Sequence, residues 1–169
     1  MKIRHGFVTN SSSSSFIIAF DNEECIETAI REAATHCFVD ADEYSHMTEE
    51  EFIGYVIAWA IQGIKDSRIG LEELKKILEE EFERQAKWKL YYSSHHFWND
   101  KGAYLQTEEY KAKAQEFISE RMEEALSEVQ NKNFISYPSF ADEDGCIGSF
   151  LEHDFIPTLK ETICHFSHH

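Results

Sequence analysis

Helix breakers are scarce in this sequence, because its 169 residues include only two prolines and seven glycines. Proline and glycine interrupt regular structure, so their scarcity favours long helices. No apolar run approaches the roughly 18 residues that would cross a bilayer. Residues 1–20 also lack the continuous apolar stretch of a signal peptide. We therefore expect a cytoplasmic protein with no membrane partner.

Cysteine is also sparse, and its spacing is unsuited to a metal or redox motif. None of the four forms a C-x-x-C pair, the spacing typical of zinc knuckles and redox centres; they are Cys25, Cys37, Cys146 and Cys164. Three acidic residues, separated from Cys146 by one glycine, would raise the pKa of its thiol, which makes it a poor nucleophile. The sequence predicts reduced thiols in a protein core.

Positive charge is the third shortage, since 32 acidic residues face 16 basic ones and the net charge is −16. Such a surface repels nucleic acid and anionic membranes, so neither is an expected direct partner. The excess is concentrated in residues 40–83, which hold 13 acidic and 4 basic residues. This segment is either a set of solvated helix faces or a surface for a basic protein. The candidate partner-binding residues are Glu49, Glu50, Glu79 and Glu80.

What the sequence does contain is enough apolar material for a core: 42% of residues are hydrophobic and 14% aromatic. Apolar residues at helical spacing predict four helices. Two have clear starts, because Thr48 and Glu51 form a Thr-x-x-Glu capping box and Thr107 is a good N-cap. The four predicted helices cover residues 21–37, 48–64, 71–91 and 107–129. In the second, Tyr55 and Trp59 widen the apolar stripe, so we expect that helix to be covered on more than one side.

Strand patterns occur near both ends of the chain. We expect strands at 2–8 and 15–20 around a loop at 10–15, another at 133–140 that ends near Pro138, and a last one at 162–166. A short helical piece is expected at 147–153. No internal repeat or linker is present, so residues 1–169 are expected to form one domain. The predicted fold class is α+β, with a layer of about four helices on a small sheet built from the N- and C-terminal segments.

Five consecutive serines run directly into an apolar strand. Hydroxyls and backbone N–H groups in a turn can cradle an anion, and a nearby arginine would add positive charge. The run lacks the glycines and the Gly-Lys-Ser/Thr ending of a P-loop, and it precedes a strand rather than a helix. The alternative is a structural turn whose hydroxyls bond to local backbone groups. The candidate anion-binding residues are Arg4, Asn10, Ser11, Ser12, Ser13, Ser14 and Ser15.

Acidic residues and histidines gather near the other end, in 142–144 and 152–154. Clustered carboxylates suit hard divalent cations, although Cys146 and Ile147 after Gly145 exclude an EF-hand. A zinc site would need histidines from different segments, with His95 or His96 as further ligands. A divalent metal is the one cofactor suggested, and the alternative is an acidic turn closed by glycine. The candidate metal ligands are Asp142, Asp144, His153 and His165.

Two segments carry a resemblance to known proteins. The stretch from Arg4 through Asn10 to Phe16 resembles the R-x-G-F-V-S/T-N-S-S-S-S-S-F signature that opens many small uncharacterised phage and bacterial proteins. The block from Asp142 to His153, D-E-D-G-x-x-G-S-x-L-E-H, is similar to one that recurs in such proteins. The resemblance implies a phage or mobile-element context and supplies no activity.

Three functions remain open from the sequence. The leading hypothesis is a small acidic accessory protein, without enzymatic activity, that binds a basic, nucleic-acid-handling protein and so acts as an inhibitor, in the manner of an anti-defence protein. The second is a phosphate-ligand-binding domain or metal-assisted hydrolase, whose site would join the serine run to the segment from Asp142 to His153. The third is a virion or assembly component that forms oligomers through aromatic residues.

Overall fold

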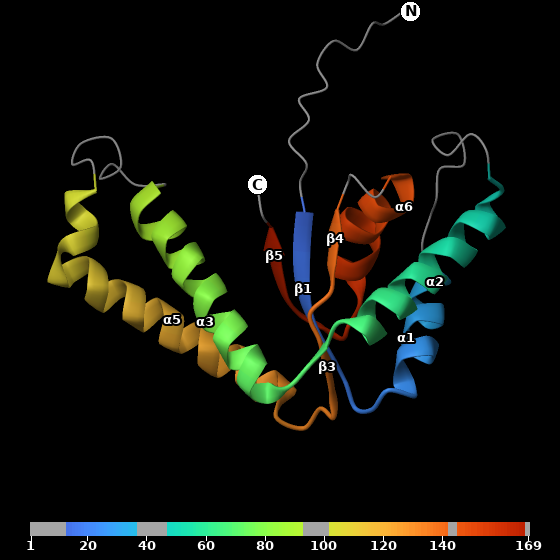
Figure 1. Cartoon of the computed structure of the whole chain (residues 1–169), viewed down its shortest axis with the longest axis horizontal. Helices are drawn as coiled ribbons and strands as arrows, with labels where there is room; N and C mark the ends of the chain where they lie inside the picture. The colour runs from blue at the N-terminus through green and yellow to red at the C-terminus, as the bar shows by residue number, and fades with distance from the viewer. Residues whose placement is uncertain (1–12, 37–46, 93–101, 142–144, 168–169) are drawn as a thin grey trace, which may run out of the picture. The chain divides into compact units, whose positions relative to one another are not determined.

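The computed structural model describes residues 13–36, 47–92, 102–141 and 145–167 (Figure 1). The chain divides into two compact units. We call Met1–Arg68 with Ser136–His169 the sheet unit, and Ile69–Ile135 the helical unit. The expectation of one domain stays a prediction, because two compact units can belong to one domain or to two.

The sheet unit is built around β1 (Ser13–Phe20), which pairs antiparallel with β4 (Ser139–Ala141) and β5 (Thr162–Ser167). Figure 1 shows β1 between these two strands. Two further strands lie where the chain passes between the units, β2 (Arg68–Ile69) and β3 (Phe134–Ser136). The strand order is β2-β3-β1-β4, and β5 also pairs with β1. The prediction of a sheet formed by the N- and C-terminal segments is confirmed.

The serines of β1 are aligned with residues of β4 on one side and of β5 on the other. Ser14 lies opposite Phe140 on one neighbour and Ser167 on the other. Pro138 has no N–H, and its carbonyl accepts a bond of 3.0 Å from the Phe16 N–H. Residues 14–20 are buried throughout. A strand buried on both faces carries a continuous apolar run, as Phe16 to Phe20 does.

Helices complete the sheet unit: α1 (Cys25–Ala34), α2 (Glu49–Asp66) and α6 (Gly145–Phe150), which continues into a π-helical turn η5 (Leu151–Phe155) and a 3-10 turn η6 (Ile156–Thr158). The capping box is confirmed, since Glu51 N–H donates to Thr48 Oγ1 and Thr48 N–H donates to Glu51 Oε2. α2 lies close to β4, because a Cβ at Gly63 would be 3.1 Å from the Phe140 ring. Near the end of the same helix, Ser136 Oγ donates to the Ile64 carbonyl at 2.6 Å.

The helical unit contains two long helices, α3 (Leu71–Lys87) and α5 (Glu108–Val129). A π-helical turn η2 (Trp88–Tyr92) extends α3, and a 3-10 turn η3 (Ala103–Gln106) precedes α5. The two helices pack through small and apolar side chains: Leu74, Leu78, Phe82, Ala86, Ala114, Ala125 and Val129. All four predicted long helices are therefore present, and the α+β class is confirmed. In the part of the chain that the structure describes, no helix is both long and apolar enough to cross a membrane.

Candidate functional site

The serine run is partly strand rather than loop. Ser13, Ser14 and Ser15 belong to β1, so the strand begins two residues before the predicted start at 15. Ser14 and Ser15 are buried, with 2% and 5% of their surface exposed. The other candidates of the anion site, Arg4, Asn10, Ser11 and Ser12, lie outside the described residues.

Ser14 contacts the segment that the second hypothesis placed beside it. Its Oγ donates a hydrogen bond of 2.8 Å to Glu152 Oε1, across 138 positions of sequence. Glu152 lies in the π-helical turn η5 and is fully buried. The structure therefore joins the serine run to the segment that ends at His153.

Glu152 is an unusual core residue, because its second oxygen, Oε2, has no hydrogen-bond partner among the described residues. His153 Nε2 lies 3.8 Å from this oxygen, which is beyond hydrogen-bond distance. A buried polar atom without a partner costs about 1–3 kcal/mol. π-helical turns occur often at functional sites, so Glu152 is the clearest sign of a site in the core of the sheet unit.

The chemistry of this contact disfavours a phosphate ligand at Ser14. The hydroxyl proton that would bond to a phosphate oxygen is donated to Glu152 instead. An acidic side chain in direct contact with the serine also repels an anion. In the described part of the predicted anion site, Ser14 therefore links β1 to η5, which favours a structural role over anion binding.

Two of the four candidate metal ligands lie within the described residues. Asp142 and Asp144 lie outside them. His165 is exposed on β5, and its ring stacks on Phe16 with centroids 4.6 Å apart. Within the described ranges, no three His, Cys, Asp or Glu side chains lie close enough to hold a metal ion together. His153 Nε2 lies 3.8 Å from Glu152 Oε2, and these two side chains alone do not make a structural zinc site.

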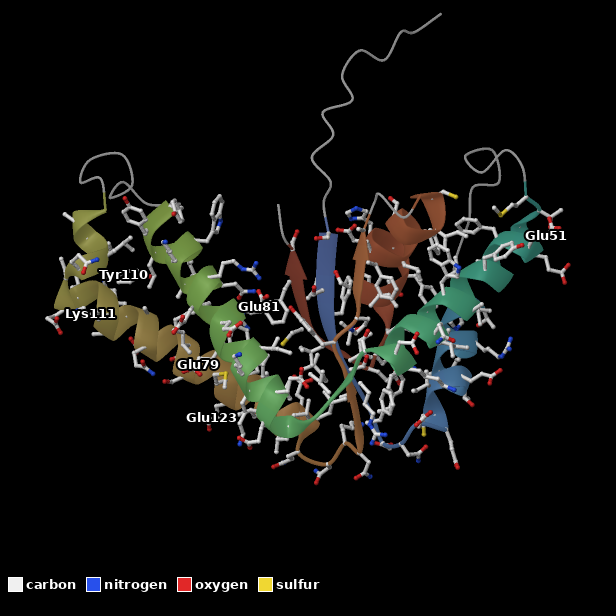
Figure 2. The ribbon with its side chains drawn as sticks, viewed as in Figure 1. Glu51, Glu79, Glu81, Tyr110, Lys111 and Glu123 are labelled. Atoms are coloured by element: carbon white, nitrogen blue, oxygen red, sulfur yellow. The ribbon has the colours of Figure 1, made fainter. Side chains whose placement is uncertain are left out.

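The four acidic partner-binding candidates fall in different units. Glu49 and Glu50 lie in the exposed first turn of α2, in the sheet unit, whereas Glu79 and Glu80 are exposed on α3, in the helical unit. Figure 2 labels Glu51, the neighbour of Glu50, and Glu79. The candidates therefore form two acidic surfaces, one on each unit.

Six of the fourteen acidic residues of the helical unit are paired with basic neighbours on the same helix. Lysines or arginines three or four positions away pair with them on α3 and α5: Glu72, Glu80, Glu81, Glu108, Glu109 and Glu124. The pairing raises the pKa of Lys113, chiefly through its hydrogen bond to Glu109. By contrast, Glu49 and Glu50 form no ion pair with any described residue.

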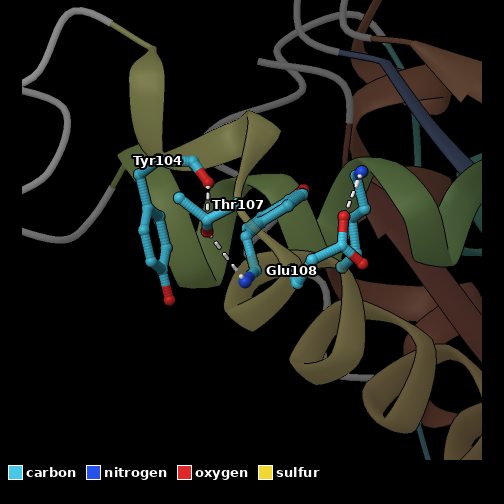
Figure 3. Close-up of polar contacts among 5 residues, drawn as sticks. Tyr104, Thr107 and Glu108 are labelled. Carbon is cyan, nitrogen blue, oxygen red and sulfur yellow. Dashed lines mark hydrogen bonds and ion pairs between the residues drawn. The ribbon is translucent and has the colours of Figure 1, made fainter.

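Two side chains close to the helix N-caps have shifted pKa values. Hydrogen bonds from Thr48, first from its backbone and then from its side chain, hold the pKa of Glu51 below its ordinary value of 4.5. In the helical unit, Thr107 Oγ1 donates to the Tyr104 carbonyl at 2.7 Å and accepts from the Tyr110 N–H at 3.1 Å (Figure 3). Burial, followed by the charge of Glu83, raises the pKa of the Tyr110 phenol.

One surface was missed by the sequence reasoning, because Tyr55 and Trp59 were expected to be covered. Half of Tyr55 and 44% of Trp59 are exposed, one helical turn apart on α2. The buried face of α2 consists of Phe52, Val56, Ala60 and Ile64. These four residues recur every fourth position and so form one buried face by themselves. That spacing was the signal that the rest of the helix surface is left to solvent.

Comparisons with protein-family models, with curated proteins and with solved structures found no match to this chain.

Proposed function

We propose that this chain is a small acidic accessory protein that binds a basic protein partner through the sheet unit. The observation that carries the proposal is the uneven distribution of charge. The sheet unit holds 18 acidic and 6 basic residues, a balance of −12, whereas the helical unit holds 14 and 10, a balance of −4. Three quarters of the net charge therefore lies in the sheet unit.

Unpaired charges are the ones that act on a partner at a distance. An ion pair on one helix cancels most of its own field beyond the Debye length, about 8 Å at physiological salt. Glu49 and Glu50 have no such pair among the described residues, so their field extends into solvent and can steer a basic protein toward α2. The partner that fits is a protein whose basic surface normally holds nucleic acid. The resemblance of the serine segment to phage proteins supports a phage or mobile-element setting.

The test uses fluorescently labelled protamine, an arginine-rich protein that binds DNA, and measures its binding by anisotropy. Binding is expected to weaken as NaCl is raised, and the protein should release a DNA oligonucleotide from protamine. The variant E49Q/E50Q should weaken binding by up to roughly thirtyfold, because each of the two exposed charges contributes at most about 1 kcal/mol.

The matched control is E79Q/E80Q, which removes the same charge from the helical unit. It should have the smaller effect, because Lys76 Nζ lies 3.8 Å from Glu80 Oε1 and already offsets one of its two charges. Binding that does not respond to salt, no binding, or an equal loss in both double variants would contradict the proposal.

A further inference from the structure

The exposed face of α2 has a regular pattern. Residues at successive spacings of four and three follow one line along the solvent side of the helix, and all are exposed; they are Glu51, Tyr55, Ala58, Gln62 and Lys65, which we call the α2 stripe. A repeat that averages 3.5 residues is the spacing of a helix seam that packs against another helix. Trp59 lies beside the stripe and adds a second large exposed ring.

We propose that the α2 stripe is the docking surface for a second copy of this chain, with the two α2 helices antiparallel and crossing at Ala58. The argument is charge complementarity. Glu51 lies seven positions before Ala58 and Lys65 lies seven positions after it. An antiparallel pair centred on Ala58 therefore places Glu51 of each copy opposite Lys65 of the other.

The same symmetry matches the remaining positions. Tyr55 lies three positions before Ala58 and Gln62 lies four after it, so they come within one residue of register and a phenol lies near an amide that can donate to it or accept from it. Ala58 faces its own equivalent, and so small a side chain lets two helices approach to the short end of the usual 8–10 Å. A two-fold axis places the same side of both helices on the same side of the dimer. Both copies of Trp59 therefore lie together beside the crossing.

Charge also selects the direction of packing. A parallel pair would place Glu51 against Glu51 and Lys65 against Lys65, and like charges directly opposed are unfavourable. Lys65 forms no ion pair with any described residue, so its ammonium group has no competing partner within the described chain. Glu51 keeps its contacts with Thr48 and remains negatively charged, because the pKa of its carboxyl is lowered.

This interface is distinct from the proposed binding of a basic partner, which rests on Glu49 and Glu50. The two also respond differently to salt. Screening should weaken the binding of a basic protein, whereas it should leave an interface built largely on Tyr55, Ala58 and Trp59 in place and relieve repulsion between two acidic copies. A failure of one therefore does not count as a failure of the other.

The test measures the mass of the full chain by sedimentation over concentrations up to roughly 0.1 mM, a range that detects weak interfaces. A dimer is expected for the wild type, and A58E should dissociate it, because two carboxylates would meet at the crossing. The matched control is W88A, which removes the most exposed large ring among the described residues, at 66%, from the helical unit. It should leave the dimer unchanged.

A charge swap makes the test specific. E51K alone and K65E alone should each weaken the dimer by at least about tenfold, since each creates two like-charge contacts. An equal mixture of the two variants should recover wild-type association, because every pair is then again opposite in sign. Circular dichroism and melting curves establish that each variant is folded.

A wild-type chain that stays monomeric over this range overturns the proposal. So does a dimer that survives A58E, or a mixture of E51K and K65E that associates no better than either variant. If the wild type is monomeric and A58E instead abolishes protamine binding, the stripe belongs to the basic partner and not to a second copy.

Discussion

The Ser14 hydroxyl donates a hydrogen bond to Glu152, a fully buried glutamate 138 positions later in the chain. This bond ties the central strand to a π-helical turn that follows α6. The only described hydrogen bond of the Glu152 carboxyl group is the one from Ser14. The stability of the sheet unit should therefore depend on this single serine more than on its neighbours.

Ser14→Ala is expected to destabilise the protein by about 1–3 kcal/mol, because the buried carboxyl loses its described donor. Urea unfolding followed by circular dichroism measures the change. Ser13→Ala is the control, since Ser13 is half-buried and its side chain has no described bond; it should stay within about 0.5 kcal/mol of wild type. Equal effects of the two substitutions would refute the special role of Ser14.

The α2 capping box should make stability depend on acid pH. The pKa of Glu51 is lower in the folded chain than in the unfolded one, so its contribution is complete above the ordinary value of 4.5 and is lost as pH falls below it. Melting temperatures of wild type and Glu51→Gln should therefore differ most at pH 6 and converge in acid. A constant difference across that range would show that the charge of Glu51 is not responsible.

Thr107→Ala should cost about 1 kcal/mol, because it removes the hydrogen bond that caps the first turn of α5. Thr107→Ser keeps an oxygen in the same place and should retain most of the stability, which makes it the matched control. Urea midpoints of the two variants decide the question. If serine is as damaging as alanine, the loss comes from the methyl group and not from the cap.

Tyr110 should titrate above the ordinary range of a tyrosine phenol. Burial and Glu83 raise the pKa of its phenol, so absorbance at 295 nm should show a late step that disappears in Tyr110→Phe and moves to lower pH in Glu83→Gln. The effect on stability is opposite in sign to that of Glu51. The contribution of Tyr110 to the free energy of unfolding is complete below pH 10 and is lost as pH rises, because the unfolded chain releases the phenol proton first. An unshifted step in Glu83→Gln would exclude the charge of Glu83 as a cause.

Local signals in the sequence predicted much of the fold. Thr48 and Thr107 are helix starts in the structure because capping needs only residues within one turn. The strand predicted at 133–140, with its end near Pro138, is two short strands in the structure, β3 before Pro138 and β4 after it, because a residue without an N–H interrupts a strand ladder but does not prevent pairing beyond it.

Features that depend on distant partners were predicted less well. The second hypothesis placed the serine run beside the segment from Asp142 to His153, but nothing near Ser14 in the sequence identifies Glu152, 138 positions away, as the acceptor of its hydrogen bond. The exposure of Tyr55 and Trp59 was missed because apolar residues on both sides of a helix do not reveal which side the rest of the chain covers. The candidate residues of the anion and metal sites in 1–12 and 142–144 stay predictions.

The pairing of β1 with β4 and β5 has a consequence for how the chain folds during synthesis. β1 leaves the ribosome about 120 residues ahead of β4, and the strand that will fill the centre of the sheet must wait without neighbours while the helices are made. Its apolar run, Phe16 to Phe20, lacks the pairing of β4 and β5 during that interval. The helical unit is one continuous stretch and can fold meanwhile from nearby contacts. The serines at the start of β1 would keep this early strand more soluble until its partners arrive.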